Sequence, residues 1–209
     1  MTAAVDFIIS MIGIGAISFV ATNIDDIFLL MIFFSSPNFL ARNIVIGQYL
    51  GIGLLVSISA LGSLIALVVP SFIIGLMGLA PIVIGIKKLS ELRADDKNKE
   101  VRSQERLQGY SKKPSSSYLS FLSVSAVTFA NGGDNIGVYT PLFAKYNSVF
   151  EVTILVSIFM AMTAVWCAMG YYLVSHPLLE KHMRRFGHVV LPFVLIGLGV
   201  YIMADAFLF

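Results

Sequence analysis

The sequence predicts an all-α membrane protein with six transmembrane helices, arranged as two inverted three-helix repeats. Three observations support this fold class: a strongly apolar composition, a one-sided distribution of basic residues, and a polar motif that occurs twice. The chain has 209 residues, of which 57% are hydrophobic and 12% are charged. Because soluble domains carry about 25% charged residues, this composition is typical of an integral membrane protein.

Six apolar segments are candidates for membrane spans, since a transmembrane helix needs about 20 residues. They lie near residues 6–34, 44–69, 72–90, 118–146, 150–174 and 188–208. They divide the chain into a first three-helix repeat (1–90), a charged cytoplasmic linker (91–117) and a second three-helix repeat (118–209). The first residues lack the basic region of a cleavable signal peptide, so we expect the first segment to remain.

The basic residues predict the orientation of these spans. If six spans alternate in direction, every Lys and Arg except Lys145 falls on one side of the membrane. The positive-inside rule makes that side cytoplasmic and places both termini outside. We therefore expect a multi-pass protein of the cytoplasmic membrane, with Lys87, Lys88 and Arg93 in the loop after the third span.

Two adjacent carboxylates, Asp25 and Asp26, lie near the centre of the first apolar segment. Each would cost about 2.5–3.5 kcal/mol at mid-membrane, so both need compensation by a cation, a proton or free backbone groups. A straight helix over residues 7–34 would be about 42 Å long, whereas the hydrocarbon core is about 30 Å thick. A break at residues 22–26 reconciles the two lengths. The alternative is an interfacial loop, but 7–21 and 27–36 are each short for a span.

A related motif occurs in the fourth segment. Asn131 and Asp134 follow Asn23 and Asp26 at a separation of 108 residues, and Pro192 follows Pro81 at 111. Because each half would contain three spans, the second half would insert upside down relative to the first. Inverted repeats of this kind, with a site at the midplane on interrupted helices, are typical of secondary transporters. We therefore expect the first and fourth helices to be interrupted near the midplane.

These two motifs predict one cation site. Carboxylate and amide oxygens are the ligands that divalent cations accept in proteins. The candidate ligands are Asp25, Asp26, Asp134, Asn135, Asn23 and Asn131. Crowding and burial favour protonation of an empty site, and a metal would displace the protons. The sequence therefore predicts exchange of a divalent metal for protons, with the metal as substrate and no resident cofactor.

Four further residues are secondary candidates. Thr22 and Thr128 could add hydroxyl oxygens to the site, and Gln48 lies near the cytoplasmic end of the second span. Cys167 would supply a soft ligand, although Met and Cys in an apolar helix more often fill the core. The glycines around Gln48 favour close helix packing.

Other classes of function fit less well. The sequence has no phosphate-binding Gly-x-x-x-x-Gly-Lys-Ser/Thr motif, so it does not predict an ATP-driven pump. An intramembrane aspartyl protease would need Gly-x-Gly-Asp, whereas this chain has Asn131 at the first position before Gly132, Gly133 and Asp134. We expect no enzyme and no nucleic-acid partner. The sequence leaves open the alternative that the protein only sequesters metal at the membrane. It also leaves open whether the chain assembles into a homo-oligomer in the bilayer.

The motifs together resemble the bacterial cadmium-resistance transporter family of the lysine-exporter superfamily. The similarity follows the chain in order through Ala21-Thr22…Asp25-Asp26, Ile46-Gly47-Gln48-Tyr49-Leu50-Gly51, Gly75-Leu76-Met77-Gly78-Leu79-Ala80-Pro81-Ile82…Gly85-Ile86-Lys87 and Gly133-Asp134-Asn135-Ile136-Gly137…Pro141. The resemblance implies export of cadmium, and of zinc as a second substrate, with Asp25, Asp26, Asp134 and Asn135 as the matching polar positions. Some members have a cysteine before the second motif, where this chain has Asn131.

That difference shifts the expected site towards oxygen ligands, which suit manganese and calcium. A manganese or calcium transporter is therefore the first alternative. The second is an amino-acid exporter of the same superfamily. Such an exporter would need a basic residue for the substrate carboxylate, and the sequence indicates none within the spans.

Overall fold

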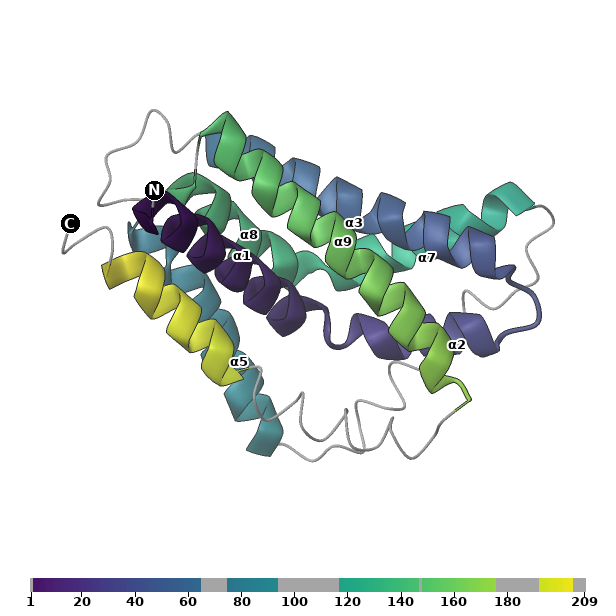
Figure 1. Cartoon of the computed structure of the whole chain (residues 1–209). Helices are drawn as coiled ribbons and strands as arrows, with labels where there is room; N and C mark the ends of the chain where they lie inside the picture. The colour runs from purple at the N-terminus through teal and green to yellow at the C-terminus, as the bar shows by residue number, and fades with distance from the viewer. Residues whose placement is uncertain (1, 65–74, 94–116, 147, 176–191, 205–209) are drawn as a thin grey trace.

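Helices are the only regular secondary structure in the described part of the chain. The computed structural model describes residues 2–64, 75–93, 117–146, 148–175 and 192–204 (Figure 1). Its helices are α1 (Thr2–Asn23), α2 (Asp26–Ser35), α3 (Ala41–Leu64), α5 (Leu79–Arg93), α7 (Ser117–Asn131), α8 (Gly133–Lys145), α9 (Val149–Leu173) and the helix Pro192–Ala204. The predicted all-α class is confirmed for these residues. The linker predicted at 91–117 lies almost wholly outside them.

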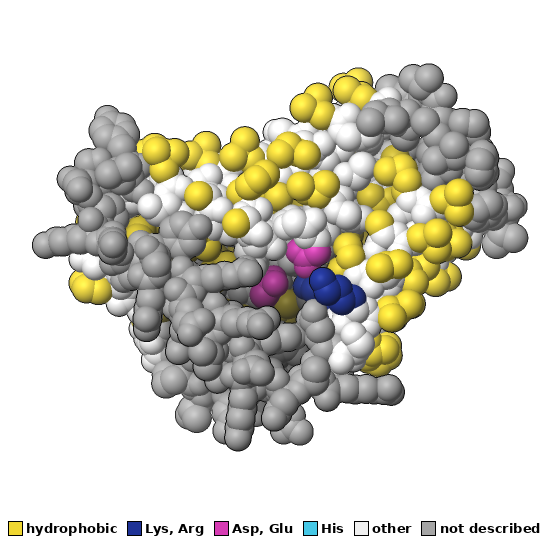
Figure 2. Space-filling view, turned by 180° about the vertical axis from the view of Figure 1, so that it is seen from behind, with side chains coloured by type: hydrophobic (Ala, Val, Ile, Leu, Met, Phe, Trp, Pro, Cys, Tyr) yellow, Lys and Arg dark blue, Asp and Glu magenta, His cyan; other side chains and the backbone are white. Residues whose placement is uncertain are grey.

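Within the described ranges, three helices are long and apolar enough to cross a membrane. They are Val5–Asn23 within α1, Ala41–Leu64 and Val149–Leu173. Shorter apolar helices are Asp26–Ser35, Ser120–Asn131 and Pro192–Ala204. Many large apolar side chains on the long helices face outwards, such as Ile17, Leu54 and Val165, which are 53%, 50% and 46% exposed. Figure 2 shows apolar side chains spread over the outer face, as lipid contact requires.

The first apolar segment is interrupted, as the length argument predicts, but the break divides it unequally. α1 starts at Thr2 and has 22 residues, whereas α2 has 10. The expectation that each part is too short to span is therefore wrong for α1. The residues before Phe7 extend the helix, because Ala3, Ala4 and Val5 do not interrupt it.

The two interrupted segments run in opposite directions. In Figure 1, α1 leads into α2 from left to right, and α7 leads into α8 from right to left. Contacts between them confirm this arrangement. Phe7 near the start of α1 stacks edge-on against Tyr146 after α8, with ring centroids 6.2 Å apart, while Asp26 lies beside Asn131. The two helix breaks therefore face each other.

Glycines allow α3 to approach α7 closely. A Cβ atom on Gly47 would lie 2.6 Å from the carbonyl oxygen of Phe121 and 2.6 Å from Cβ of Val124. A Cβ atom on Gly51 would lie 2.6 Å from Cβ of Thr128. The predicted packing role of these glycines is confirmed, and it places Gln48, between them, against α7.

An aromatic cluster fills the space between α1, α8 and α9. Phe159 stacks on Phe19, Tyr139 and Phe143 with ring centroids 5.8, 4.5 and 5.9 Å apart, and Trp166 meets Phe19 at 5.4 Å. These rings are buried. Because buried aromatic side chains bring large apolar contact areas, this cluster holds the end of α1 against α9.

Close backbone contact also joins α5 to the helix Pro192–Ala204. A Cβ atom on Gly78 would lie 2.7 Å from the carbonyl oxygen of Gly199, and one on Gly85 would lie 2.8 Å from that of Pro192. Pro81 lies in the first turn of α5, where a missing N–H does not interrupt a helix. The helical backbone is instead interrupted before Pro81, by a turn at Gly78.

We predict opposite effects of alanine at two glycines of α3. Gly47→Ala should lower the free energy of unfolding by about 1–3 kcal/mol, because the methyl group meets the backbone of α7. Gly53→Ala is the matched control and should raise stability by up to about 1 kcal/mol, since no other described helix comes within 4 Å of the position that its methyl group would take. Unfolding of the detergent-solubilised protein in dodecyl sulfate, followed by circular dichroism, measures both. Equal stability of the two variants would contradict the packing role.

Candidate cation site

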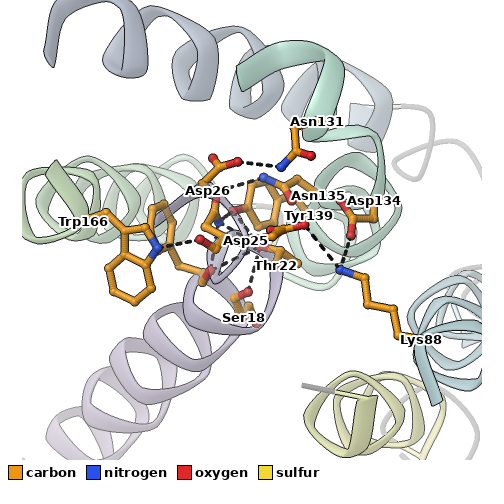
Figure 3. A network of polar contacts seen from close by, with 12 residues as sticks. Ser18, Thr22, Asp25, Asp26, Lys88, Asn131, Asp134, Asn135, Tyr139 and Trp166 are labelled. Carbon is orange, nitrogen blue, oxygen red and sulfur yellow. Dashed lines mark hydrogen bonds and ion pairs between the residues drawn. The ribbon is translucent and has the colours of Figure 1, made fainter. Parts of the chain in front are cut away.

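The candidate site lies where the two helix breaks meet. α1 ends at Asn23 and α2 begins at Asp26, while α7 ends at Asn131 and α8 begins at Gly133. Nδ2 of Asn131 donates to Oδ1 of Asp26 over 2.7 Å, and Nδ2 of Asn135 donates to Oδ1 of Asn23 over 3.0 Å (Figure 3). Polar side chains of the two predicted motifs therefore contact each other directly, although they are separated by more than 100 residues in sequence.

Both breaks keep helical or near-helical backbone angles. Asp25 has φ −74° and ψ −28°, and Gly132 has φ −81° and ψ 22°. A Cβ atom on Gly132 would overlap the side chain of Leu55 on α3. Close packing against α3 therefore requires glycine at this position. The absence of a side chain lets the junction of α7 and α8 lie against α3.

Asp26 is held by neutral donors from two other helices. Its side chain is buried, and its Oδ2 accepts a hydrogen bond of 3.1 Å from Nε2 of Gln48 on α3. Oε1 of Gln48 in turn accepts a bond of 2.7 Å from the hydroxyl of Thr128 on α7. With the bond from Asn131, both carboxylate oxygens of Asp26 have donors. The network fixes this carboxylate at the junction of α2, α3 and α7.

Asn23 is held equally firmly on the other side of the site. Its Nδ2 donates to the hydroxyl of Tyr139 over 2.6 Å and to Oγ1 of Thr22 over 2.9 Å. The hydroxyls of Thr22 and Tyr139 are 3.0 Å apart. The backbone carbonyl of Asn23 accepts a bond of 2.6 Å from the indole Nε1 of Trp166 on α9. The last turn of α1 is therefore tied to both α8 and α9.

Lys88 brings a positive charge to the two remaining aspartates. Its Nζ lies 2.6 Å from Oδ2 of Asp134 and 4.0 Å from Oδ2 of Asp25. Figure 3 shows the side chain reaching from α5 to the edge of the network. The placement of Lys88 in the loop after the third span is wrong: it lies on α5, two turns beyond Pro81, and it reaches the site.

The site is partly open where Lys88 enters. The side chains of Asp25, Asp134 and Lys88 are 36%, 20% and 22% exposed. Figure 2 shows acidic and basic side chains next to each other near the middle of this face, with apolar side chains exposed elsewhere on its described part. Asp26, by contrast, is 2% exposed. The site thus has an inner part around Asp26 and Asn23 and an outer part around Lys88.

The predicted ligands do not all meet at one point. Asp26 contacts Gln48 and Asn131, whereas Asp25 and Asp134 share Lys88. Across the described residues, no group of three or more His, Cys, Asp and Glu side chains is placed to hold a metal ion. A metal ion bound in this geometry would need amide oxygens beside one or two carboxylates.

Two buried oxygen atoms of the predicted ligands could contact a bound cation. Oδ1 of Asp25 and Oδ1 of Asn135 are buried and have no hydrogen-bond partner within the described part of the chain. A buried oxygen atom without a donor costs free energy. Both atoms belong to predicted ligands at the two breaks, so a cation bound there would relieve the cost.

Cys167, the predicted soft ligand, lies on α9. It is a free cysteine buried on α9, and the contact from this turn of α9 to the network comes from its neighbour Trp166.

A sequence model of the cadmium resistance transporter family, Cad, matches residues 19–208. The chain belongs to this family. The match starts near the end of α1 and includes every residue of the network described above. The searches of curated proteins and of solved structures found no match.

Membership in the Cad family confirms the resemblance stated from the sequence motifs. It makes the chain a membrane transport protein connected with cadmium resistance, which agrees with its apolar helices. A transporter family is also consistent with the expectation that the chain is not an enzyme.

Three residues of this candidate site were not predicted from the sequence: Lys88, Tyr139 and Trp166. A signal existed for Lys88, because buried carboxylates require a nearby cation and Lys88 follows directly on an apolar segment. The sequence holds no comparable signal for Tyr139 or Trp166. Aromatic residues in apolar helices are common, and only the fold brings these two to Asn23.

We predict that Tyr139→Phe destabilises the protein. The change keeps the ring against Phe159 but removes the hydroxyl that contacts Thr22 and Asn23. Loss of a buried hydrogen-bond partner costs about 1–3 kcal/mol. Unfolding in dodecyl sulfate measures the effect, with Tyr171→Phe as control because Tyr171 is 59% exposed. Equal losses for both variants would show that the hydroxyl of Tyr139 has no special role.

Proposed function

We propose that this protein exports divalent cations from the cytoplasm, with cadmium as the first substrate and zinc as the second. The observation that carries the proposal is the network of carboxylate and amide oxygens at two facing helix breaks, within an apolar bundle. Burying polar and charged side chains within an apolar bundle costs free energy. Binding of a transported ion gives a physical reason for their presence there. The Cad family supplies the expectation of cadmium.

The packing of the helices supports an inverted repeat as the architecture of this exporter. α3 packs on α7 and α8, and α9 packs on α1 and α2. These contacts are reciprocal: the second span of each half covers the interrupted helix of the other half. A two-fold axis in the membrane plane generates such an exchange. In the proposed orientation both termini lie outside and the end of α5 faces the cytoplasm.

The ligands of the metal would be oxygen atoms from both breaks. Asp25, Asp26 and Asp134 supply carboxylates, and Asn23, Asn131 and Asn135 supply amide oxygens. Thr22, Thr128 and Gln48 hold these ligands in place through hydrogen bonds. Oxygen atoms also suit manganese and calcium, which remain the alternative substrates.

An amino-acid exporter is a second candidate because of Lys88. The sequence disfavours this class because it indicates no basic residue within the spans, but in the fold Lys88 supplies one at the site. Its ammonium group is already neutralised by Asp134, which leaves it less suited to a substrate carboxylate. Uptake of lysine and of cadmium into the same inverted vesicles separates the two candidates.

We predict that export fails without the carboxylates of the two breaks. Asp26→Asn and Asp134→Asn should each reduce cadmium efflux by at least about a hundredfold, because a neutral amide binds a divalent cation much more weakly than a carboxylate does. Efflux of radioactive cadmium from intact cells measures this effect, with immunoblots to show equal amounts of protein in the membrane.

Asp6→Asn is the matched control for these variants. Asp6 lies on α1 like the motif of the first break, but it is exposed near the start of the helix. It should leave efflux unchanged. Normal efflux by both Asp26→Asn and Asp134→Asn would rule out the proposed site.

We predict that export is coupled to protons. Metal binding to a protonated carboxylate site releases protons, so uptake of cadmium into inverted vesicles should make the lumen more alkaline. A pH-sensitive dye trapped in the vesicles reports the change. An imposed gradient with an acidic lumen should accelerate uptake severalfold, and vesicles that carry Asp6→Asn should respond in the same way. Uptake that ignores the gradient and leaves internal pH unchanged would exclude antiport.

A further inference from the structure

Lys88 occupies a position that a bound metal ion would need. Its ammonium nitrogen lies 2.6 Å from Oδ2 of Asp134 and 4.0 Å from Oδ2 of Asp25. These two aspartates belong to different helix breaks and are both proposed metal ligands. The ammonium group therefore lies between ligands contributed by the two halves of the chain, where it acts as a cation that is covalently part of the protein.

A divalent cation cannot bind both aspartates while Lys88 stays in place. Metal–oxygen distances are about 2.0–2.6 Å, so a metal on Oδ2 of Asp134 would lie next to the ammonium nitrogen. The two positive charges would repel each other strongly in a partly buried site. Binding at Asp134 thus requires Lys88 to move away.

The two parts of the site differ in how their charge is compensated. Asp26, in the inner part, receives hydrogen bonds from the neutral amides of Gln48 and Asn131, which are fixed on α3 and α7. Asp25 and Asp134, in the outer part, face a charge at the end of a flexible four-carbon side chain. The compensation in the outer part can therefore be withdrawn by rotation of the Lys88 side chain, without movement of a helix.

Lys88 and the two aspartates form a partly exposed group. The side chain of Lys88 is 22% exposed, and those of Asp134 and Asp25 are 20% and 36% exposed, so solvent reaches this part of the site. Lys88 also lies five residues before Arg93, where α5 ends on the side that the proposed orientation makes cytoplasmic. A metal ion arriving from that side would meet Lys88 at the entrance of the site.

We propose that Lys88 is a tethered counter-cation, which neutralises Asp134 and Asp25 in the empty transporter and is displaced by the incoming divalent cation. This inference rests on the proposed function, since it assigns Lys88 a role at the same site. It also gives a reason for selectivity. Replacing an ammonium group with a monovalent cation gains no charge interaction, whereas replacing it with a divalent cation does. Lys88 is therefore a specificity-determining residue.

The first experiment measures cadmium binding to purified protein by calorimetry. Lys88→Met keeps the length of the side chain but removes its charge, so it should lower the Kd for cadmium by about tenfold or more. Sodium at high concentration should compete with cadmium in this variant but not in the wild type. Lys88→Arg should restore wild-type binding and selectivity, because the charge returns.

Lys87→Met is the matched control. Lys87 is the exposed neighbour of Lys88 on α5, and its removal changes the net charge equally. It should leave the Kd unchanged within about twofold. Wild-type or weaker binding of cadmium by Lys88→Met would overturn the counter-cation role, as would equal effects of Lys87→Met and Lys88→Met.

A second experiment uses the wild type and does not depend on folding of a variant. Reductive methylation followed by mass spectrometry measures the reactivity of each lysine. Cadmium should increase the methylation of Lys88 severalfold relative to Lys87, because displacement separates its ammonium group from Asp134. Unchanged or reduced methylation at a saturating cadmium concentration would show that Lys88 stays in place, and would overturn the inference.

The two experiments separate this inference from the proposed function. If the wild type binds and transports cadmium but Lys88 neither controls affinity nor changes reactivity, only the counter-cation role fails. If the wild type neither binds nor transports any divalent cation, the proposed function fails and the inference fails with it.

Discussion

The structure depends on the compensation of carboxylates that lie within an apolar helical bundle. Asp26 is 2% exposed, and such a group is tolerated only when donors satisfy both of its oxygens. The donors come from Gln48 on α3 and Asn131 on α7, so these two helices must lie close together at the level of the first break. Because Gly47 and Gly51 have no side chains, α3 and α7 can approach each other this closely. Packing and polar chemistry therefore impose the same arrangement on α3.

The two breaks carry related motifs but have different surroundings. Asp26 in the first motif accepts hydrogen bonds from neutral amides, whereas Asp134, its counterpart in the second, is paired with an ammonium group. The difference arises from the neighbouring helices, because α3 contributes Gln48 to Asp26 while α5 contributes Lys88 to Asp134. The repeated motif thus predicts that the two breaks are related. The neighbouring helices determine which partner each aspartate has.

Much of this arrangement was predictable from the sequence, for physical reasons. The apolar runs and the excess length of the first segment predict broken helices, and the spacing of Asn23 and Asp26 with Asn131 and Asp134 predicts that the breaks are related. The contact of Asp26 with Asn131 agrees with that prediction. The position of Lys88 was not predicted, because charge counting assigns a lysine at the end of a span to the loop, whereas a helix that continues to Arg93 carries it back to the site. The roles of Tyr139 and Trp166 depend on contacts between distant segments, which no local pattern encodes.

The bond from Trp166 to the carbonyl of Asn23 has a mechanical consequence. It joins the middle of α9 to the last residue of α1 over 2.6 Å, and the stacking of Phe19 on Trp166 and Phe159 reinforces the connection. A hydrogen bond of this length is lost when its atoms separate by about 1 Å. A larger displacement of α9 either carries the end of α1 with it or breaks this bond. α1 and α9 therefore move together as long as the bond holds, and the turn at Ile24 and Asp25 is where α1 can bend relative to α2.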